Sequence, residues 1–402
     1  MKNKLQFPQN FSRSGISCSV FLFAVLAVPA LQSQTYTLVH SFQFAEGTLL
    51  GGLTVDPQGN LYGVAGSGGD SNCQNPQNRQ GCGTVFKIDT SGGVFTILHT
   101  FTPEPDGSMP TGAPYRDGAG NLYGVTYYGG NGSGTIYKID PRGNETVLHN
   151  FAPTDPAGGN PVGPLVPDGK GNLYGIASGG ADHVGTIFRM SKNGNVALVH
   201  SFAFSDGSGP SGSLAIDHLG NIYGTTVFGG ASDWGTVFKI DPSGNESVLY
   251  SFTGGANGSE PEQGVILDSA GNLYGTTASG GISCSGFGCG VIFKLSPDGE
   301  ESTVFSFFGI PTDGADPNMP LLMDSAGNLY GTTFGGGTRA DSAGTIFKID
   351  PTGKETILYQ FSKAHGTTPL WGLIGDGAGN VYGTTNQGGA YNFGTVFRLT
   401  VR

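Results

Sequence analysis

Residues 56–63 read Asp-Pro-Gln-Gly-Asn-Leu-Tyr-Gly, and the pattern Asp-x-x-Gly-Asn-(Leu/Ile/Val)-Tyr-Gly occurs seven times in the 402-residue chain. The copies begin at Asp56, Asp117, Asp168, Asp217, Asp268, Asp324 and Asp376. An aspartate side chain caps a tight turn, and the glycine three residues later accepts the positive φ of a bulged hairpin. Each copy therefore predicts a β-hairpin.

Two further motifs accompany every copy. Gly-Thr-(Val/Ile)-Phe-Lys or a close variant follows it, and a string resembling Thr-Val-Leu-His-Ser-Phe ends the repeat. Together the motifs predict four strands, a to d, which in the first copy span 52–56, 60–65, 84–89 and 95–101. Four antiparallel strands recurring about every 50 residues are typical of a propeller blade. The three aromatic positions of each repeat are predicted to pack between blades.

The two chain ends predict how the array closes. The last repeat stops at its strand c, 394–400, whereas an extra strand-d motif, 37–42, precedes the first repeat. Pairing these strands removes the open edges of a linear array. We therefore predict an all-β, seven-bladed β-propeller with four antiparallel strands per blade, forming a single domain over 34–402. Its blades are predicted at 43–101, 102–151, 152–202, 203–252, 253–307, 308–361, and 362–402 plus 36–42.

The first thirty residues differ from the repeats. Lys2, Lys4 and Arg13 precede an apolar run, 18–28, which small residues and Pro29 end. This pattern predicts a cleaved export signal over 1–30, because the run is shorter than the ~20 residues of a membrane span. The formal charge of −11 disfavours nucleic acid and anionic membranes as partners. We expect a secreted or periplasmic protein, monomeric and without a membrane span.

Four of the five cysteines lie in the repeats, as two local pairs. Cys73 stands near Cys82, and Cys284 stands near Cys289. An even number of cysteines in an exported chain favours disulfides, so we predict one bond within each pair.

The combined motifs resemble the GloVer tandem repeat, found in exported bacterial proteins that often carry one of several C-terminal anchoring segments. The resemblance covers about residues 36–402. Arg402 follows directly on the last strand, so the chain is expected to lack such an anchor. The resemblance implies no known catalytic activity, and no site residue is transferred from it.

Several polar residues recur with the repeat, and we interpret them structurally. His40, His99, His149 and His200 share a strand-d position with Tyr250, Phe305 and Tyr359, which predicts a packing position for a flat ring. The strand-c Lys or Arg is expected to pair with a strand-d Glu across the c–d hairpin. The seven turn aspartates are predicted to cap turns rather than bind calcium. We predict no catalytic constellation, metal site or cofactor.

The residues that differ between repeats are concentrated in the b–c and d–a loops, which are expected to emerge on one face of the propeller. Variable loops on a rigid scaffold are where recognition is usually found. Candidate ligand-binding residues there are Asp106, Asp206, Asp313, Tyr127, Tyr128, Trp234 and Trp371. We predict a non-enzymatic binding or scaffold propeller that recognises an extracellular glycan or protein. The alternative is a glycoside hydrolase or polysaccharide lyase with loop carboxylates at the channel mouth.

Overall fold

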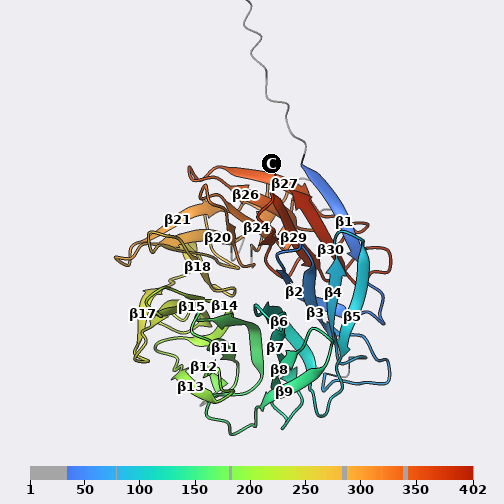
Figure 1. The fold of residues 1–402 in the computed structure, drawn as a ribbon. Coiled ribbons are helices and arrows are strands. Elements are labelled where there is room, and N and C mark those ends of the chain that lie inside the picture. The colour runs from blue at the N-terminus through green and yellow to red at the C-terminus, as the bar shows by residue number, and fades with distance from the viewer. Residues whose placement is uncertain are drawn as a thin grey trace, which may run out of the picture. The chain divides into compact units, whose positions relative to one another are not determined.

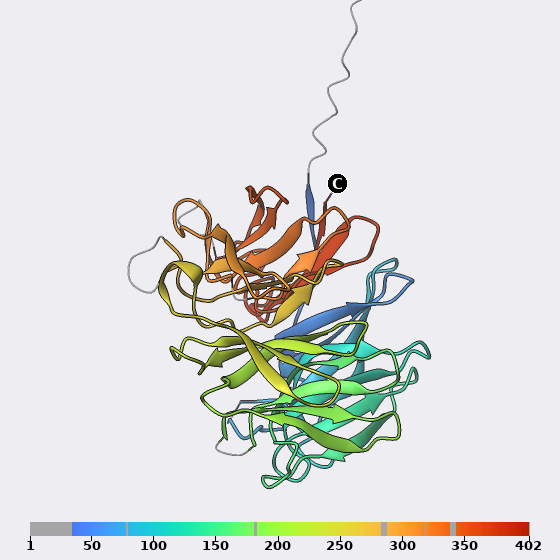
Figure 2. The same cartoon turned by 90° about the vertical axis from the view of Figure 1, so that its left-hand side faces the viewer.

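The structure is a computed structural model, and it describes residues 34–77, 79–180, 183–282, 288–317, 319–337 and 343–401. The chain divides into the segment Met1–Ser33 and a compact unit, Gln34–Arg402. The predicted export signal lies outside the described residues. Within the compact unit, sheets follow one another around a centre in chain order (Figure 1). Figure 2 shows the same unit from the side.

Seven four-stranded antiparallel sheets form the blades. Their strands follow one another in chain order from the innermost to the outermost, except in blade 7, where β1 is the outer strand. Blade 1 comprises β2 (Thr48–Val55), β3 (Leu61–Ser67), β4 (Thr84–Asp89) and β5 (Val94–Thr100). Blade 2 comprises β6 (Ser108–Arg116), β7 (Leu122–Tyr128), β8 (Thr135–Ile139) and β9 (Glu145–Asn150). Blade 3 comprises β10 (Pro161–Pro167), β11 (Leu173–Ala177), β12 (Thr186–Met190) and β13 (Val196–Ser201). Blades 4 and 5 comprise β14 (Ser208–Ile216), β15 (Ile222–Phe228), β16 (Thr236–Ile240) and β17 (Glu246–Ser251); β18 (Val265–Leu267), β19 (Leu273–Thr276), β20 (Val291–Leu295) and β21 (Glu301–Ser306). Blades 6 and 7 comprise β23 (Leu322–Met323), β24 (Leu329–Thr333), β26 (Thr345–Ile349) and β27 (Glu355–Gln360); β28 (Ile374–Gly375), β29 (Asn380–Thr385), β30 (Thr395–Thr400) and β1 (Thr35–Ser41).

Two short elements supplement the blades. A two-stranded pair, β22 (Gly314–Ala315) and β25 (Gly335–Gly336), lies beside blade 6, and a single 3₁₀ turn, η2, spans Gly255–Asn257. The predicted all-β, seven-bladed propeller with four antiparallel strands per blade is confirmed.

The seventh blade is assembled from both ends of the chain. β1 pairs antiparallel with β30, so that Thr35 faces Thr400 and Ser41 faces Thr395. Leu38, which faces Phe397, precedes a bulge in the ladder. The predicted closing pair of strands is therefore present. Its N-terminal strand begins two residues earlier and ends one residue earlier than the predicted range 37–42.

An aromatic pair fills each seam between neighbouring blades. The strand-d phenylalanine of one blade packs edge-to-face on the strand-c ring of the next, as Phe202 does on Phe238 with 5.0 Å between ring centroids. The other six pairs are Phe42–Phe86, Phe101–Tyr137, Phe151–Phe188, Phe252–Phe293, Phe307–Phe347 and Phe361–Phe397. This confirms that the repeated aromatic residues pack between blades.

The turn aspartates act as predicted. Asp56 accepts hydrogen bonds from the backbone N–H groups of Gln58 and Asn60, while its second oxygen accepts from the Asn60 amide and the Tyr62 hydroxyl. One carboxylate thereby satisfies a hairpin and the strand that leaves it. The hydrogen bonds to Asn60 and Tyr62 hold the pKa of Asp56 below its usual value against the opposing effect of burial.

The partner predicted for the strand-c lysines is wrong. Lys138 is opposite Thr146 in the ladder, and Glu145 is opposite Ile139. The Lys138 ammonium lies instead over the Tyr123 ring, 5.9 Å from its centroid. Four further blades repeat this arrangement. The b–c ladder places Tyr and Lys side by side, so a cation–π contact replaces the expected ion pair.

Candidate functional site

The b–c and d–a loops leave the blades at the same end of the strands, and we call this end the loop face. Buried threonines of strand c hold the d–a loops in place. The Thr135 hydroxyl donates to the Asp106 carbonyl, and the Thr236 hydroxyl donates to the Asp206 carbonyl, each over 3.2 Å. The loop face is therefore built on hydrogen bonds to the rigid blades.

A ring of seven residues stands where the d–a loops enter the innermost strands. Every member has a positive φ, and the ring consists of Leu49, Met109, Asn160, Gly209, Glu260, Asp316 and Thr368. We call it the mouth ring. Five members donate their N–H to a carbonyl of the preceding blade, as Asp316 does to Cys289 of blade 5. The Asp316 carbonyl in turn accepts from the N–H of Phe334 of blade 6, and both bonds are 2.9 Å long. Side chains in this left-handed conformation are rare and gather at functional sites.

The mouth ring is acidic at blades 5 and 6. Burial, followed by the charges of Glu262 and Glu260, raises the pKa of Asp316 to about 6. The Oδ1 atom of Asp316 is buried and makes no hydrogen bond within the described residues. The Glu260 carboxylate accepts from the Ser279 hydroxyl over 3.1 Å. A cluster of carboxyl groups in which one has a raised pKa can exchange hydrogen bonds with the hydroxyls of a polyhydroxylated ligand.

The innermost strands line a narrow axial cavity of about 170 Å³. Trp371 lies in its wall together with Leu373 of the same blade and with Leu53 and Pro164 from other blades. The candidate residue Trp371 therefore belongs to the channel, below the mouth ring.

Exposed aromatic rings lie at the loop face in blades 4 and 6, at positions that the repeat motifs do not mark. Phe204 and Phe308 lie in d–a loops, and Phe228 and Phe334 end or follow strand b. Phe204 is 62 % exposed and Phe334 is 44 % exposed. Large exposed apolar groups on one face indicate a binding surface. The positions vary between repeats, so the repeat pattern itself gave no signal for them.

The three candidate aspartates lie within their own loops. Asp106 and Asp313 are buried, while Asp206 is half-buried. Asp106 accepts hydrogen bonds from Thr102 and His99, and Asp313 accepts from the N–H groups of Phe308 and Gly309. These bonds order the d–a loops. Their proposed role in ligand binding stays a prediction.

The remaining aromatic candidates lie in different loops and do not line one common pocket. The Tyr127 and Tyr128 rings pack edge-to-face, 4.6 Å apart, and the Tyr128 hydroxyl accepts from the Gln77 amide of blade 1 over 3.2 Å. Trp234 packs in the core of blades 4 and 5, and its carbonyl accepts from the N–H of Glu260 over 3.1 Å. Trp234 thus positions the acidic part of the mouth ring.

The histidine row packs as predicted and also has partners that the sequence did not indicate. Each ring lies edge-on to the adjacent strand-d phenylalanine. Each Nε2 also meets a d–a loop carboxylate: Glu46 at 3.0 Å, Asp106 at 2.7 Å, Asp155 at 2.8 Å and Asp206 at 3.1 Å. The histidine and the acid are always six or seven residues apart, and this regular spacing is the sequence signal that could have identified them as partners.

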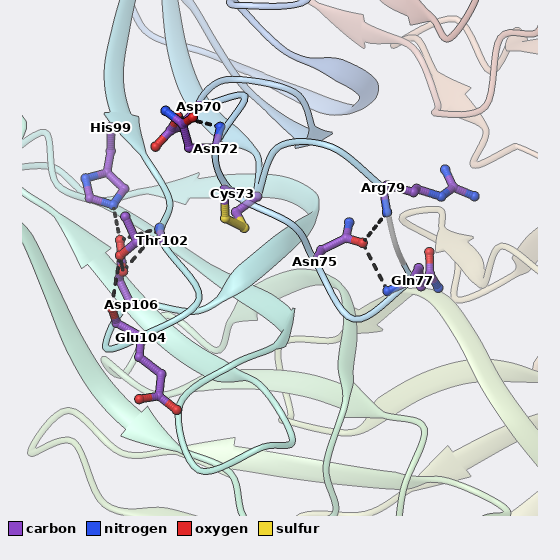
Figure 3. Close-up of a disulfide and its surroundings, with 11 residues drawn as sticks. Asp70, Asn72, Cys73, Asn75, Gln77, Arg79, His99, Thr102, Glu104 and Asp106 are labelled. Carbon is purple, nitrogen blue, oxygen red and sulfur yellow. Dashed lines mark hydrogen bonds and ion pairs between the residues drawn. A yellow bond between two sulfur atoms is a disulfide. The ribbon is translucent and has the colours of Figure 1, made fainter.

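The first long b–c loop is closed by the predicted disulfide between Cys73 and Cys82, whose Cα atoms are 5.7 Å apart. Figure 3 shows this loop beside His99, whose ring points at Asp106. Asn75 adds a turn within the loop by accepting from the N–H groups of Gln77 and Arg79. Cys289 is buried, but Cys284 lies outside the described residues, so the second disulfide stays a prediction.

The opposite face, which carries the short a–b and c–d turns, also has cavities. A groove of about 610 Å³ lies between blades 2 and 3, and one of about 650 Å³ lies between blades 5 and 6. Their walls are the repeated turns, including the Tyr–Lys stacks. Because they follow from the spacing between blades, they are less distinctive than the acidic, aromatic loop face.

Two solved structures resemble this chain in fold but share little sequence identity with it. One is an oligogalacturonate lyase from Vibrio parahaemolyticus, with a TM-score of 0.54, 12% identity, and coverage of 91% of this chain and 93% of the other. The second is the extracellular domain of a protein described as a one component system from B. thetaiotaomicron, with a TM-score of 0.57, 11% identity, and coverage of 91% and 40%. At these identities the likeness shows the fold alone. No curated protein matches the chain in sequence.

Within the part of the chain that the structure describes, no helix has the length and apolar character that a membrane crossing requires. The family model of the Gloeobacter/Verrucomicrobia repeat matches residues 73–287 and 285–402. The matches cover most of the propeller, in agreement with the resemblance carried by the three repeated motifs. The chain therefore belongs to the Gloeobacter/Verrucomicrobia repeat family.

Proposed function

We propose that this protein is an exported binding propeller that recognises a glycan at the mouth ring of its loop face. The observation that carries the proposal is the backbone hydrogen bond between Phe334 and Asp316, which joins a residue with an exposed aromatic ring to a member of the acidic cluster. A sugar ring has apolar C–H faces that pack on aromatic rings and hydroxyls that hydrogen-bond to carboxyl groups. Export to a secreted or periplasmic location is supported by the Cys73–Cys82 disulfide, because such bonds persist in oxidising compartments.

The test is a glycan array probed with the purified protein, followed by calorimetry on the best ligand. Phe334→Ala and Asp316→Asn are expected to weaken binding at least tenfold. Leu219→Ala is the control, because Leu219 is 62 % exposed in an a–b turn on the opposite face. Equal affinity in all three variants, or the absence of any glycan ligand, would contradict the proposal and favour a protein partner.

A second candidate function is a carbohydrate-active enzyme, favoured by the raised pKa of Asp316 beside Glu260 and Glu262. A carboxyl group whose pKa is raised toward neutral pH is suited to be a general acid, and a neighbouring carboxylate is suited to be a base. Incubating bound oligosaccharides with the protein distinguishes the two functions. An enzyme releases new chain ends and loses turnover in Asp316→Asn, whereas a binding protein leaves the ligand intact.

A further inference from the structure

The outer edge of each seam brings together three repeat positions. The first is an aromatic or histidine side chain near the end of strand d, and the second is a residue of the d–a loop. The third is a residue near the start of strand d in the next blade. The c–d turn of that next blade packs against the preceding blade. In order from the seam between blades 1 and 2, the triads are His99–Asp106–Glu145, His149–Asp155–Val196, His200–Asp206–Glu246, Tyr250–Asn257–Glu301, Phe305–Asp313–Glu355, Tyr359–His365–Tyr36 and, across the closing seam, His40–Glu46–Phe95.

Three of the seven triads are joined across the seam by direct contacts among their own members. At the closing seam the His40 ring stacks on Phe95, with 4.4 Å between centroids. At the seam between blades 6 and 7, Tyr359 and Tyr36 stack at 3.9 Å. Between blades 4 and 5 the Tyr250 hydroxyl donates to Glu301 over 3.4 Å.

The triad between blades 3 and 4 is different, because its three metal-ligand atoms converge, whereas those of the same residue types between blades 1 and 2 do not form such a group. One ligand atom each from His200, Asp206 and Glu246 lies within 4.8 Å of the other two, and this is the single such group within the described ranges. The His200 Nε2 and Asp206 Oδ2 atoms are 3.1 Å apart, and their side chains are 17 % and 23 % exposed. The Oε1 atom of Glu246 is buried and has no hydrogen-bond partner among the described residues, as is also true of the glutamates at this position in three other triads, so the convergence of the ligand atoms is what sets this triad apart.

We propose that His200, Asp206 and Glu246 form a binding site for a divalent first-row transition metal, with zinc as the best match, that bridges blades 3 and 4. Imidazole nitrogen and carboxylate oxygen are zinc ligands at about 2.0–2.2 Å, and a tetrahedral ion places its ligand atoms about 3.3 Å from one another. The His200–Asp206 pair already has this spacing. Rotation of the Glu246 side chain brings in the third ligand and gives its buried oxygen a partner.

The surroundings hold two of the three ligands in place without metal. The His200 ring lies edge-on to Phe202 at 4.7 Å, which fixes its plane. The Oδ1 atom of Asp206 accepts from the N–H of Ala203 over 2.7 Å, which leaves Oδ2 directed at the histidine. Partial exposure of the side chains leaves room for a water as the fourth ligand. Histidine among the ligands disfavours calcium and magnesium, which prefer oxygen.

The other seams supply substitutions that the fold already accepts. Glu246→Val copies the seam between blades 2 and 3, where Val196 takes that position, and His200→Tyr copies the seam between blades 4 and 5, where Tyr250 does. Each variant removes one ligand while keeping a side chain that the repeat tolerates. His99→Tyr makes the same change in the triad between blades 1 and 2, whose ligand atoms do not converge as closely. His218→Ala removes an exposed histidine away from the seams.

The experiment measures zinc binding to the chelator-treated full chain by calorimetry, with the bound metal counted by mass spectrometry. We expect one zinc per chain, an affinity lowered at least tenfold in Glu246→Val and His200→Tyr, and no change in His99→Tyr or His218→Ala. Zinc is also expected to raise the thermal midpoint of the wild type and not of Glu246→Val. All variants are first checked for an unchanged circular dichroism spectrum in chelator. The proposal is overturned if the wild type binds no zinc, or if the two seam variants bind it as tightly as the wild type.

Discussion

The glycine that follows the repeated tyrosine is required by the aromatic ring packed against it. A Cβ atom on Gly224 would lie 2.5 Å from the Cζ atom of Phe238, and the same close approach recurs at this position in all seven blades. The Tyr-Gly pair and the strand-c aromatic residue are thus one structural unit, although the glycine and the aromatic residue are 13 to 23 positions apart in sequence. Repetition of one motif implies repetition of the other.

At this scale we predict that Gly224→Ala destabilises the protein by about 1–3 kcal/mol, because the added methyl group overpacks a filled seam. Gly118→Ala is the matched control, since a Cβ there has no neighbour within 4 Å. Urea denaturation of both variants measures the difference. Equal stability of the two would show that the strand-b glycine is not set by packing.

A second prediction concerns Glu355, near the start of the outer strand of blade 6. Burial, followed by the charge of Asp313, raises its pKa from 4.5 to about 7. The ionised form is therefore disfavoured in the folded protein. This cost is absent below pH 4.5, grows as the pH rises to 7, and is complete above that value.

Replacing Glu355 by Gln removes the ionisation. We expect Glu355→Gln to be more stable than the wild type at pH 8, by on the order of 1 kcal/mol because solvent screens part of the effect, and equally stable near pH 4. Thermal unfolding across this pH range measures it. An exposed control, Glu300→Gln, is expected to show no such pH-dependent difference. A gain that does not change with pH would refute the explanation.

Sequence reasoning was sufficient for repeated residues and insufficient for the candidate site. The turn aspartates and the seam aromatic residues each occur seven times, so the physical role inferred for one copy has to suit all seven. The acidic mouth ring depends on Glu260 and Asp316, which replace Leu49, Met109 and Asn160 at equivalent positions. Only the structure brings these single substitutions together around the axis.

At the scale of elements, the outer strands follow the motifs closely, whereas the innermost strands differ between blades. β6 and β14 have nine residues each, but β23 and β28 have only two. Nothing in the motifs distinguishes the short strands from the long ones. The loops are likewise set by contacts between blades, such as the Thr236–Asp206 hydrogen bond, which no local pattern shows.

The Cys73–Cys82 bond gives a prediction at this scale. Replacing both cysteines by serine is expected to lower the free energy of unfolding by about 2–3 kcal/mol, because the unfolded chain gains freedom when the loop is no longer closed. Urea denaturation without reductant measures the loss. In the presence of reductant the wild type and the variant should be equally stable. A wild type that is equally stable with and without reductant would contradict the prediction.

At the scale of the whole molecule, ring closure positions both proposed sites. The mouth ring needs seven innermost strands around one axis, and the metal triad needs neighbouring blades held in fixed register. Closure depends on β1, which supplies the outer strand of the last blade from the opposite end of the chain. The sequence predicted this pairing because the missing strand at one terminus matched an extra strand at the other.

The measurement that tests this account most directly is a cross-link between the two termini. Thr35 faces Thr400 in the β1–β30 ladder. In the double variant Thr35→Cys, Thr400→Cys we expect an intramolecular disulfide under mild oxidation, seen by peptide mass spectrometry, and a higher thermal midpoint than in the reduced form. Neither single variant should form this bond. Free thiols, or cross-links only between chains, would show that the ring is not closed by its two ends.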